Sequence, residues 1–214
     1  MRVLACCVVA LVSAAVVPVS ASISECGSEV RSVEGRPLDL APPKGFVDIC
    51  VEDQALCKSL TSAYPASMHP IGYFVPKDEW VNKTKPPDGF RRYLMALLVT
   101  TKTPESLPGV RAGLRGVIAA EPDKAKLEAI LKDRGQASLG VIEDASDVFA
   151  FGAVGPRQSA GSPDALLAMT NSAMALKGRM LSLYVSATVT DLKQVDAVKA
   201  LTTQWLGCLR TANK

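Results

Sequence analysis

Residues 175–191 read ALKGRMLSLYVSATVTD, and this stretch decides the fold class. From Leu181 to Val189, aliphatic side chains alternate with Ser, Tyr and Thr, which is the period of a strand with one buried face. A second apolar run, Leu166–Leu176, precedes it, and the residues Lys177-Gly178-Arg179 separate the two. The sequence therefore predicts two consecutive strands, Leu166–Leu176 and Met180–Val189.

A long helix is predicted to follow these strands. Asp191 is a good helix N-cap, and residues 198–206 read VKALTTQWL. Apolar side chains recur at helical spacing along one face, with Cys208 beside them. These side chains are Val195, Val198, Leu201, Trp205 and Leu209. The chain is therefore expected to end with an amphipathic helix that covers a sheet.

The rest of the chain alternates between short strand-like and helix-like segments. Strands are expected at 38–40, 46–51, 71–75, 92–100, 137–143 and 148–154, the last two as a hairpin. Helices are expected at 52–62, 107–118 and 122–135, and loops at 64–70, 82–89 and 155–163. With no repeat and no charged linker, the simplest architecture is a single α+β domain, in which helices pack on an antiparallel sheet.

This layout resembles the PsbP-like family of small exported or lumenal domains. The resemblance rests on the order of the elements and on the final strands and helix, in ALKGRMLSLYVSATVTD and VKALTTQWL. It implies an α/β/α sandwich around an antiparallel sheet. It implies no site residues, because that family is a scaffold with varied accessory and binding roles.

The N-terminus has the pattern of a cleavable export signal. Arg2 precedes an apolar run from Val3 to Val17, and Val19-Ser20-Ala21 offers small residues for cleavage after Ala21. The run is shorter than the roughly 20 residues that span a bilayer, which argues against a membrane anchor. We therefore expect a signal peptide at 1–21, an extended lead-in at 22–45, and a globular domain at 46–214 in the periplasm or the secreted fraction of a bacterium.

Four cysteines remain after such cleavage: Cys26, Cys50, Cys57 and Cys208. An even number in an oxidising compartment predicts disulfide bonds, although four cysteines allow three pairings. The favoured pairing joins Cys50 to Cys57, which are close in sequence, and Cys26 to Cys208 at the two ends of the mature chain. With no CxxC motif and one histidine, a zinc site is disfavoured.

Charge and motifs exclude several function classes. The chain carries 24 basic and 21 acidic residues, a net charge of +3, without the basic cluster of a nucleic-acid binder. We find no P-loop, GxGxxG or GxSxG motif, and therefore expect no cofactor and no metal. His69 is the only histidine, so a hydrolase with a histidine base would have to use it.

Aromatic residues gather between residues 73 and 93, where Pro and Lys are interleaved with them. A binding surface is one interpretation, and its members would be Tyr73, Trp80, Phe90 and Tyr93. Packing in the core is the other interpretation, with Phe74 and Tyr93 buried and Trp80 covering an edge.

The leading functional hypothesis is a non-catalytic, exported accessory domain that binds another envelope or secreted protein. Two alternatives stay open: a periplasmic hydrolase that uses His69, and a secreted effector or enzyme inhibitor. The specific partner does not follow from the sequence.

Overall fold

The fold was analysed in a computed structural model, which describes residues 25–62, 64–82, 90–100, 106–157 and 165–214. The expected signal peptide at 1–21, and most of the expected loops at 82–89 and 155–163, lie outside the described residues.

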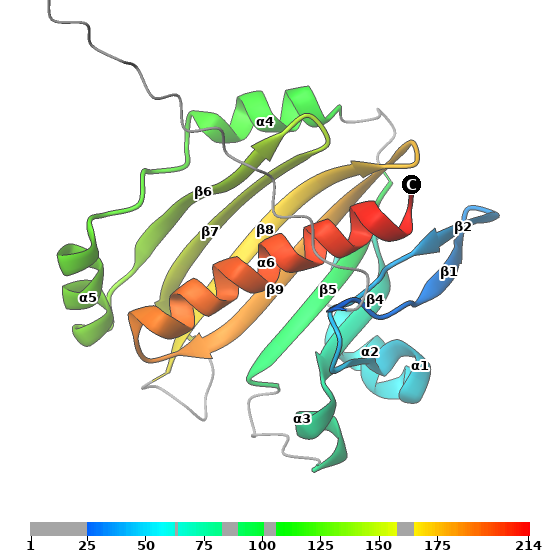
Figure 1. The fold of residues 1–214 in the computed structure, drawn as a ribbon, viewed down its shortest axis with the longest axis horizontal. Coiled ribbons are helices and arrows are strands. Elements are labelled where there is room, and N and C mark those ends of the chain that lie inside the picture. The colour runs from blue at the N-terminus through cyan, green and yellow to red at the C-terminus, as the bar shows by residue number, and fades with distance from the viewer. Residues whose placement is uncertain (1–24, 63, 83–89, 101–105, 158–164) are drawn as a thin grey trace, which may run out of the picture.

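The centre of the molecule is a seven-stranded antiparallel sheet with the strand order β3-β4-β5-β9-β8-β7-β6 (Figure 1). The chain builds β3, β4 and β5 from one edge inward, then β6 to β9 from the other edge, so that β9 pairs with β5 in the middle. The strands are β3 (Phe46–Asp48), β4 (Met68–Pro76), β5 (Arg92–Val99), β6 (Ala137–Ala145), β7 (Val148–Pro156), β8 (Leu166–Leu176) and β9 (Arg179–Val189).

The β8–β9 hairpin confirms the strands predicted from the alternating sequence. Its two-residue turn holds Lys177 at φ 48° and Gly178 at φ 75°, the left-handed pair that a tight hairpin requires. The turn is therefore shorter than expected, and Arg179 belongs to β9 opposite Leu176.

Six helices are described, and the longest, α6 (Leu192–Ala212), lies diagonally across one face of the sheet (Figure 1). Asp191 caps it as expected, by accepting a hydrogen bond from the Gln194 amide at 2.8 Å. The other helices are α1 (Ile49–Glu52), α2 (Gln54–Thr61), α3 (Lys77–Val81), α4 (Leu107–Arg115) and α5 (Lys124–Lys132). The predicted fold class, an α+β domain with helices on an antiparallel sheet, is confirmed.

Several predicted boundaries were wrong, and capping explains two of them. The strand expected at 46–51 ends at Asp48, because the Asp48 carboxylate caps α1 by accepting from the Cys50 amide. The helix expected at 52–62 forms as α2, and it begins only at Gln54 because Asp53 caps it by accepting from the Leu56 amide at 2.9 Å. α5 begins at Lys124, after the cap Asp123, so Pro122 lies outside it.

The sheet separates two apolar clusters. Alternate residues of β5 and β9, including Leu94, Leu183 and Val185, pack beneath α6 with Trp205. The intervening residues of β5, Met95 and Leu97, pack on the opposite face with Ile49 of α1 and with side chains of α2. Because successive side chains of a strand point to opposite faces, this arrangement places helices on both sides of the sheet.

The segment expected to be an extended lead-in forms a β-hairpin, β1 (Val30–Val33) with β2 (Arg36–Asp39). Leu38 and Leu40 are fully buried in the α6-side core. The indole N–H of Trp205 donates to the Leu40 carbonyl at 2.9 Å, and the Asn213 amide N–H donates to the Asp39 carbonyl at 2.6 Å. The early chain is therefore held against α6 by both apolar burial and hydrogen bonds.

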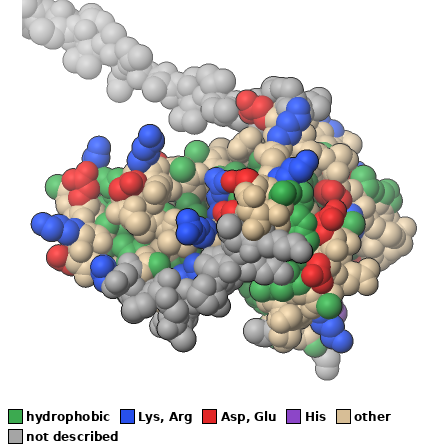
Figure 2. All heavy atoms as spheres, turned by 90° about the horizontal axis from the view of Figure 1, so that it is seen from below, with side chains coloured by type: hydrophobic (Ala, Val, Ile, Leu, Met, Phe, Trp, Pro, Cys, Tyr) green, Lys and Arg blue, Asp and Glu red, His purple; other side chains and the backbone are tan. Residues whose placement is uncertain are grey.

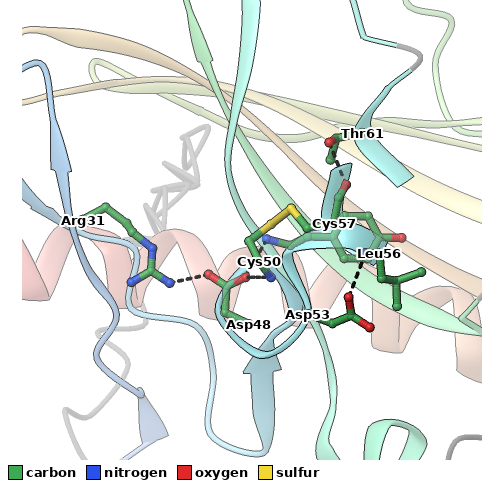
Figure 3. The surroundings of a disulfide bond; sticks show 8 residues. Arg31, Asp48, Cys50, Asp53, Leu56, Cys57 and Thr61 are labelled. Carbon is green, nitrogen blue, oxygen red and sulfur yellow. Dashed lines mark hydrogen bonds and ion pairs between the residues drawn. A yellow bond between two sulfur atoms is a disulfide. The ribbon is translucent and has the colours of Figure 1, made fainter. Parts of the chain in front are cut away.

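Both disulfide bonds of the favoured pairing are present. Cys26 pairs with Cys208, joining the early chain to α6 across a sequence separation of 182. Cys50 pairs with Cys57 across a separation of seven, and Figure 3 shows this bond linking α1 to α2. The Cα–Cα distances of 5.6 and 4.9 Å are ordinary for disulfides.

Among the described helices, none is both long and apolar enough to cross a membrane.

Candidate binding groove

An open groove lies between the N-terminal half of α6 and the adjoining ends of β5 and β9. Its volume is about 480 Å³, within the range of small-ligand and side-chain pockets. We call it the Arg91–Arg92 groove, after the two arginines at its rim. The residues that line it are Glu79, Arg91, Arg92, Ala187, Thr188, Gln194, Ala197, Val198, Ala200, Leu201 and Gln204.

Small side chains leave the space that forms the groove. Ala197 and Ala200 on α6 face Ala187 on β9, and both helix alanines are exposed. Val198 is buried and Leu201 is half-buried, so the floor of the groove is apolar. An apolar side chain that covers such a floor stabilises the complex by about 25 cal/mol for each Å² of apolar surface removed from water.

Backbone hydrogen bonds on both sides hold the rim at Arg91. Its amide donates to the Glu79 carboxylate at 3.0 Å, and its carbonyl accepts from the Thr188 amide at 2.8 Å. The Arg92 guanidinium lies 5.5 Å from the centre of the Phe46 ring, a cation–π distance. The rim therefore places two adjacent arginines where the backbone of Arg91 is hydrogen-bonded on both sides.

Both arginines are exposed, and no described carboxylate forms an ion pair with either guanidinium. The one acid that lines the groove, Glu79, accepts from the backbone of Arg91. A guanidinium presents several N–H donors suited to a carboxylate. The groove thus combines an apolar floor with a rim that carries two arginines and one carboxylate, a net positive charge.

The aromatic residues proposed as a binding surface do come together, but on the opposite face of the sheet from α6. Tyr73 stacks on Tyr93 with ring centres 5.1 Å apart, and Phe90 lies 6.5 Å from Tyr73 and 6.4 Å from Trp80. Tyr73 and Phe90 are only 6% and 4% exposed, while Trp80 and Tyr93 are half-buried. Two of the four side chains therefore belong to the second core and not to an open surface.

Burial also changes the acidity of the tyrosines in this cluster. Desolvation, with smaller contributions from Tyr93 and Tyr184, raises the pKa of Tyr64 to about 12. Burial raises the pKa of Tyr73 further above its usual value. Both phenols stay neutral through the physiological range, as expected of packing residues.

His69 was expected in a loop, and that expectation was wrong: it lies in β4, paired with Leu98 of β5. Its side chain is exposed, and no described serine, cysteine or carboxylate side chain forms a hydrogen bond with it. Over the described ranges, no three side chains of the His, Cys, Asp and Glu types converge as a metal site would require.

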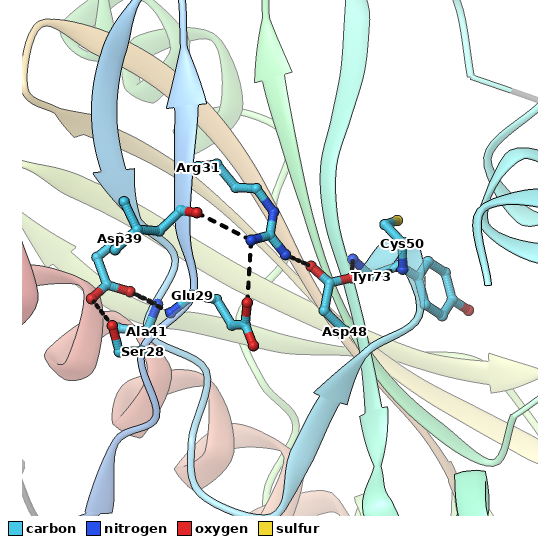
Figure 4. Close-up of polar contacts among 9 residues, drawn as sticks. Ser28, Glu29, Arg31, Asp39, Ala41, Asp48, Cys50 and Tyr73 are labelled. Atoms are coloured by element: carbon cyan, nitrogen blue, oxygen red, sulfur yellow. Dashed lines mark hydrogen bonds and ion pairs between the residues drawn. The ribbon is translucent and has the colours of Figure 1, made fainter. Parts of the chain in front are cut away.

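A buried carboxylate that the sequence analysis missed supports the aromatic cluster. Asp48 is 3% exposed, and it accepts hydrogen bonds from the amides of Cys50 and Tyr73 at 2.9 and 3.2 Å (Figure 4). The Arg31 guanidinium lies 2.5 Å from its other oxygen. Because Arg31 lies in β1 and Asp48 in β3, this pair ties the hairpin to β3, and Arg31 also pairs with Glu29 at 3.2 Å. The local signal for Asp48 was only its capping position before α1.

Charges of both signs are mixed over the face that Figure 2 shows, and the basic side chains drawn there do not merge into one continuous patch. Several pairs are formed across elements, including Arg210 with Asp147 at 2.7 Å and Arg111 with Asp144 at 3.0 Å. This mixed pattern does not resemble the basic surface of a nucleic-acid binder.

Comparison with known proteins leaves the family open. No protein-family model matches the chain, and no curated protein matches it. The solved structure of the Saccharomyces cerevisiae Ran-binding protein Mog1p is 10% identical, with a TM-score of 0.43, and the match covers 87% of this chain and 94% of that one. A mutant of Mog1 matches with 10% identity, a TM-score of 0.42 and coverage of 86% and 94%. Likeness at this level carries no functional information, and the PsbP-like resemblance stays a prediction.

Proposed function

We propose that this protein is an exported, non-catalytic binding protein of the bacterial envelope or secreted fraction. Its partner is another protein, which places an acidic segment in the Arg91–Arg92 groove. The observation that carries the proposal is the pair of exposed arginines, whose guanidinium groups form no ion pair with a described carboxylate, beside an apolar floor.

Charge complementarity selects the partner's chemistry. An acidic side chain at the rim would accept hydrogen bonds from Arg91 or Arg92, and charge-assisted bonds of this kind are roughly twice as strong as neutral ones. An apolar neighbour in the same segment would cover Ala200 and Leu201 on the floor. A strand or helix with alternating acidic and aliphatic residues therefore suits the groove better than a basic or wholly polar segment.

Fluorescence anisotropy with defined peptides tests this proposal. The probes are a labelled peptide of alternating Glu and Leu, and the same peptide with Lys in place of Glu. We expect the acidic peptide to bind and the basic one not to bind. The double variant Arg91→Glu, Arg92→Glu should weaken binding at least tenfold, which corresponds to about 1.4 kcal/mol.

A matched control changes net charge by the same amount elsewhere. Lys124→Glu with Lys126→Glu alters two exposed lysines of α5, outside the groove. This variant should bind the acidic peptide within twofold of the wild type. A photoreactive side chain at Ala200 should cross-link the peptide, whereas one at exposed Val117 should not. Equal losses in both double variants, or equal binding of the two peptides, would refute the groove as the site.

Export is tested separately by the intact mass of the protein recovered from periplasm and culture medium. A chain that begins at Ser22 and offers no thiol to an alkylating reagent supports export with two disulfides. A chain that retains Met1 and has free thiols contradicts it.

A further inference from the structure

The α6 wall of the Arg91–Arg92 groove begins at Gln194, whose side chain is held in one orientation. Gln194 lines the groove and is exposed, so a ligand can reach it. It is the third residue of α6, and its side-chain oxygen accepts from the Thr190 amide at 2.7 Å and from the Thr190 hydroxyl at 3.2 Å. This contact resembles a capping box, in which a side chain at the third helical position reaches back to the backbone before the helix. The start of α6 therefore fixes a polar side chain at this end of the groove.

The same contact decides what Gln194 presents to a ligand. A backbone N–H can only donate, so the atom of the carboxamide that faces Thr190 must be the oxygen. The NH2 group then points away from Thr190, and it donates to no other residue that the structure describes. Both lone pairs of the oxygen are used by Thr190, while the NH2 group carries two N–H donors. Gln194 therefore offers donors, and not an acceptor, to a group bound beside it.

Arg92 lies across the groove from Gln194. It pairs with Ala187 in the ladder of β5 and β9, so both side chains emerge on the face of the sheet that α6 covers. Thr190, which holds Gln194, follows Ala187 by three residues, about 10 Å along an extended chain. The Phe46 ring, 5.5 Å from the Arg92 guanidinium, stacks on one face of that group and leaves its N–H edge free. Two exposed, oriented donor groups thus flank the small side chain of Ala187.

We infer that Arg92 and Gln194 hold one carboxylate of the partner between them, and that Gln194 makes the groove select a carboxylate over a carboxamide. One carboxylate oxygen accepts from the Arg92 guanidinium and the other accepts from the Gln194 NH2 group. A carboxamide in the same place would set its own NH2 group against one of these donors in either orientation, and would leave a donor unpaired. This inference rests on the proposed function, and it names the residue that sets the specificity of the groove.

Anisotropy titration with two matched peptides tests this role. The probes are the labelled peptide of alternating Glu and Leu, and the same peptide with Gln in place of Glu. The wild type should prefer the acidic peptide by about tenfold or more. In Gln194→Glu, the new carboxylate still accepts from Thr190, so Tm should stay within about 2 °C of the wild type. The group that faces the ligand has changed from a donor to an acceptor, so the preference should fall by about fivefold or more.

Two further variants separate hydrogen bonding from net charge. Gln54→Glu makes the same chemical change at the exposed start of α2, outside the groove, and should keep the preference within about twofold of the wild type. Gln194→Ala removes the donor without adding a charge. It should weaken binding of the acidic peptide by about threefold or more and leave binding of the Gln peptide within about twofold.

The outcomes distinguish failure of this inference from failure of the proposed function. If the wild type binds neither the acidic nor the basic peptide, or binds both equally, the proposed function is wrong and the role of Gln194 is wrong with it. If the wild type binds the acidic peptide and Arg91→Glu, Arg92→Glu loses it, the groove is the site. A preference that is then unchanged in Gln194→Glu and Gln194→Ala, or reduced equally in Gln54→Glu, overturns the role of Gln194 alone.

Discussion

The disulfide between Cys26 and Cys208 should contribute more to stability than the one between Cys50 and Cys57. In the chain-entropy model, a cross-link stabilises by restricting the unfolded chain, and the effect grows with the logarithm of the loop it closes. With separations of 182 and seven residues, the model gives about 5 kcal/mol for the long loop and about 2.4 kcal/mol for the short one.

The native fold should survive loss of the long-range bond. Trp205 still donates to the Leu40 carbonyl, and Asn213 still bonds the backbone of Asp39, so α6 keeps its other contacts with the early chain. The double variant Cys26→Ala, Cys208→Ala should therefore show a native circular dichroism spectrum. Its loss of stability should arise chiefly in the unfolded state.

Urea and thermal unfolding without reductant measure both effects. For a chain of this size 1 kcal/mol shifts Tm by roughly 2–4 °C, so we expect a fall of about 10–20 °C for Cys26→Ala, Cys208→Ala. The matched variant Cys50→Ala, Cys57→Ala should fall by about 5–10 °C. Equal falls, or a larger fall for the short loop, would refute the loop-entropy reasoning and show that local strain or packing dominates.

Three further predictions concern stability. Asp48→Ala removes the acceptor of two buried amides and leaves Arg31 without that partner, so urea unfolding should show a loss of about 3 kcal/mol. Gly72→Ala should cost about 1–3 kcal/mol in the same assay, because its new Cβ would lie 2.7 Å from the Phe74 ring, whereas Gly113→Ala on exposed α4 meets nothing and should be neutral or stabilising. The Arg210 guanidinium holds the pKa of Asp147 below its usual value. The pair therefore stabilises the fold fully at a pH above the usual pKa of an aspartate, and this contribution is lost as the pH falls through the lowered pKa. Asp147→Asn should thus cost about 1 kcal/mol at neutral pH and converge with the wild type in acid.

Elements with a clear local period were predictable from the sequence. The alternation in β9 and the 3.6-residue period of α6 each report a single buried face, and both elements formed as expected. Short segments were less predictable. Capping by Asp48 replaced the end of the strand expected at 46–51 with α1, because a side-chain hydrogen bond outweighed a short apolar pattern, and capping by Asp53 set the start of α2.

The sites were much less predictable than the fold. The aromatic residues near Tyr73 are close in sequence, and the prediction that they lie together was correct. Their burial, however, depended on which face of the sheet α1 and α2 cover. Arg179 looked like part of a turn, and only the register with Leu176 places it in β9 with its charge buried. Ala200 carried no signal, and the adjacent Arg91 and Arg92 predicted only solvated charges at the start of a strand.

By itself, the sequence determined the class of fold, the final hairpin and helix, and a cysteine pattern suited to two disulfides. The first three depend on local periodicity, and the last depends on the number and spacing of the cysteines. The tertiary structure alone decided the pairing of β1 with β2, the Asp48–Arg31 pair and the Arg91–Arg92 groove. Each of these joins residues from distant parts of the chain. Their meeting depends on strand register and on the angle at which α6 crosses the sheet, which are set by the packing of the whole core.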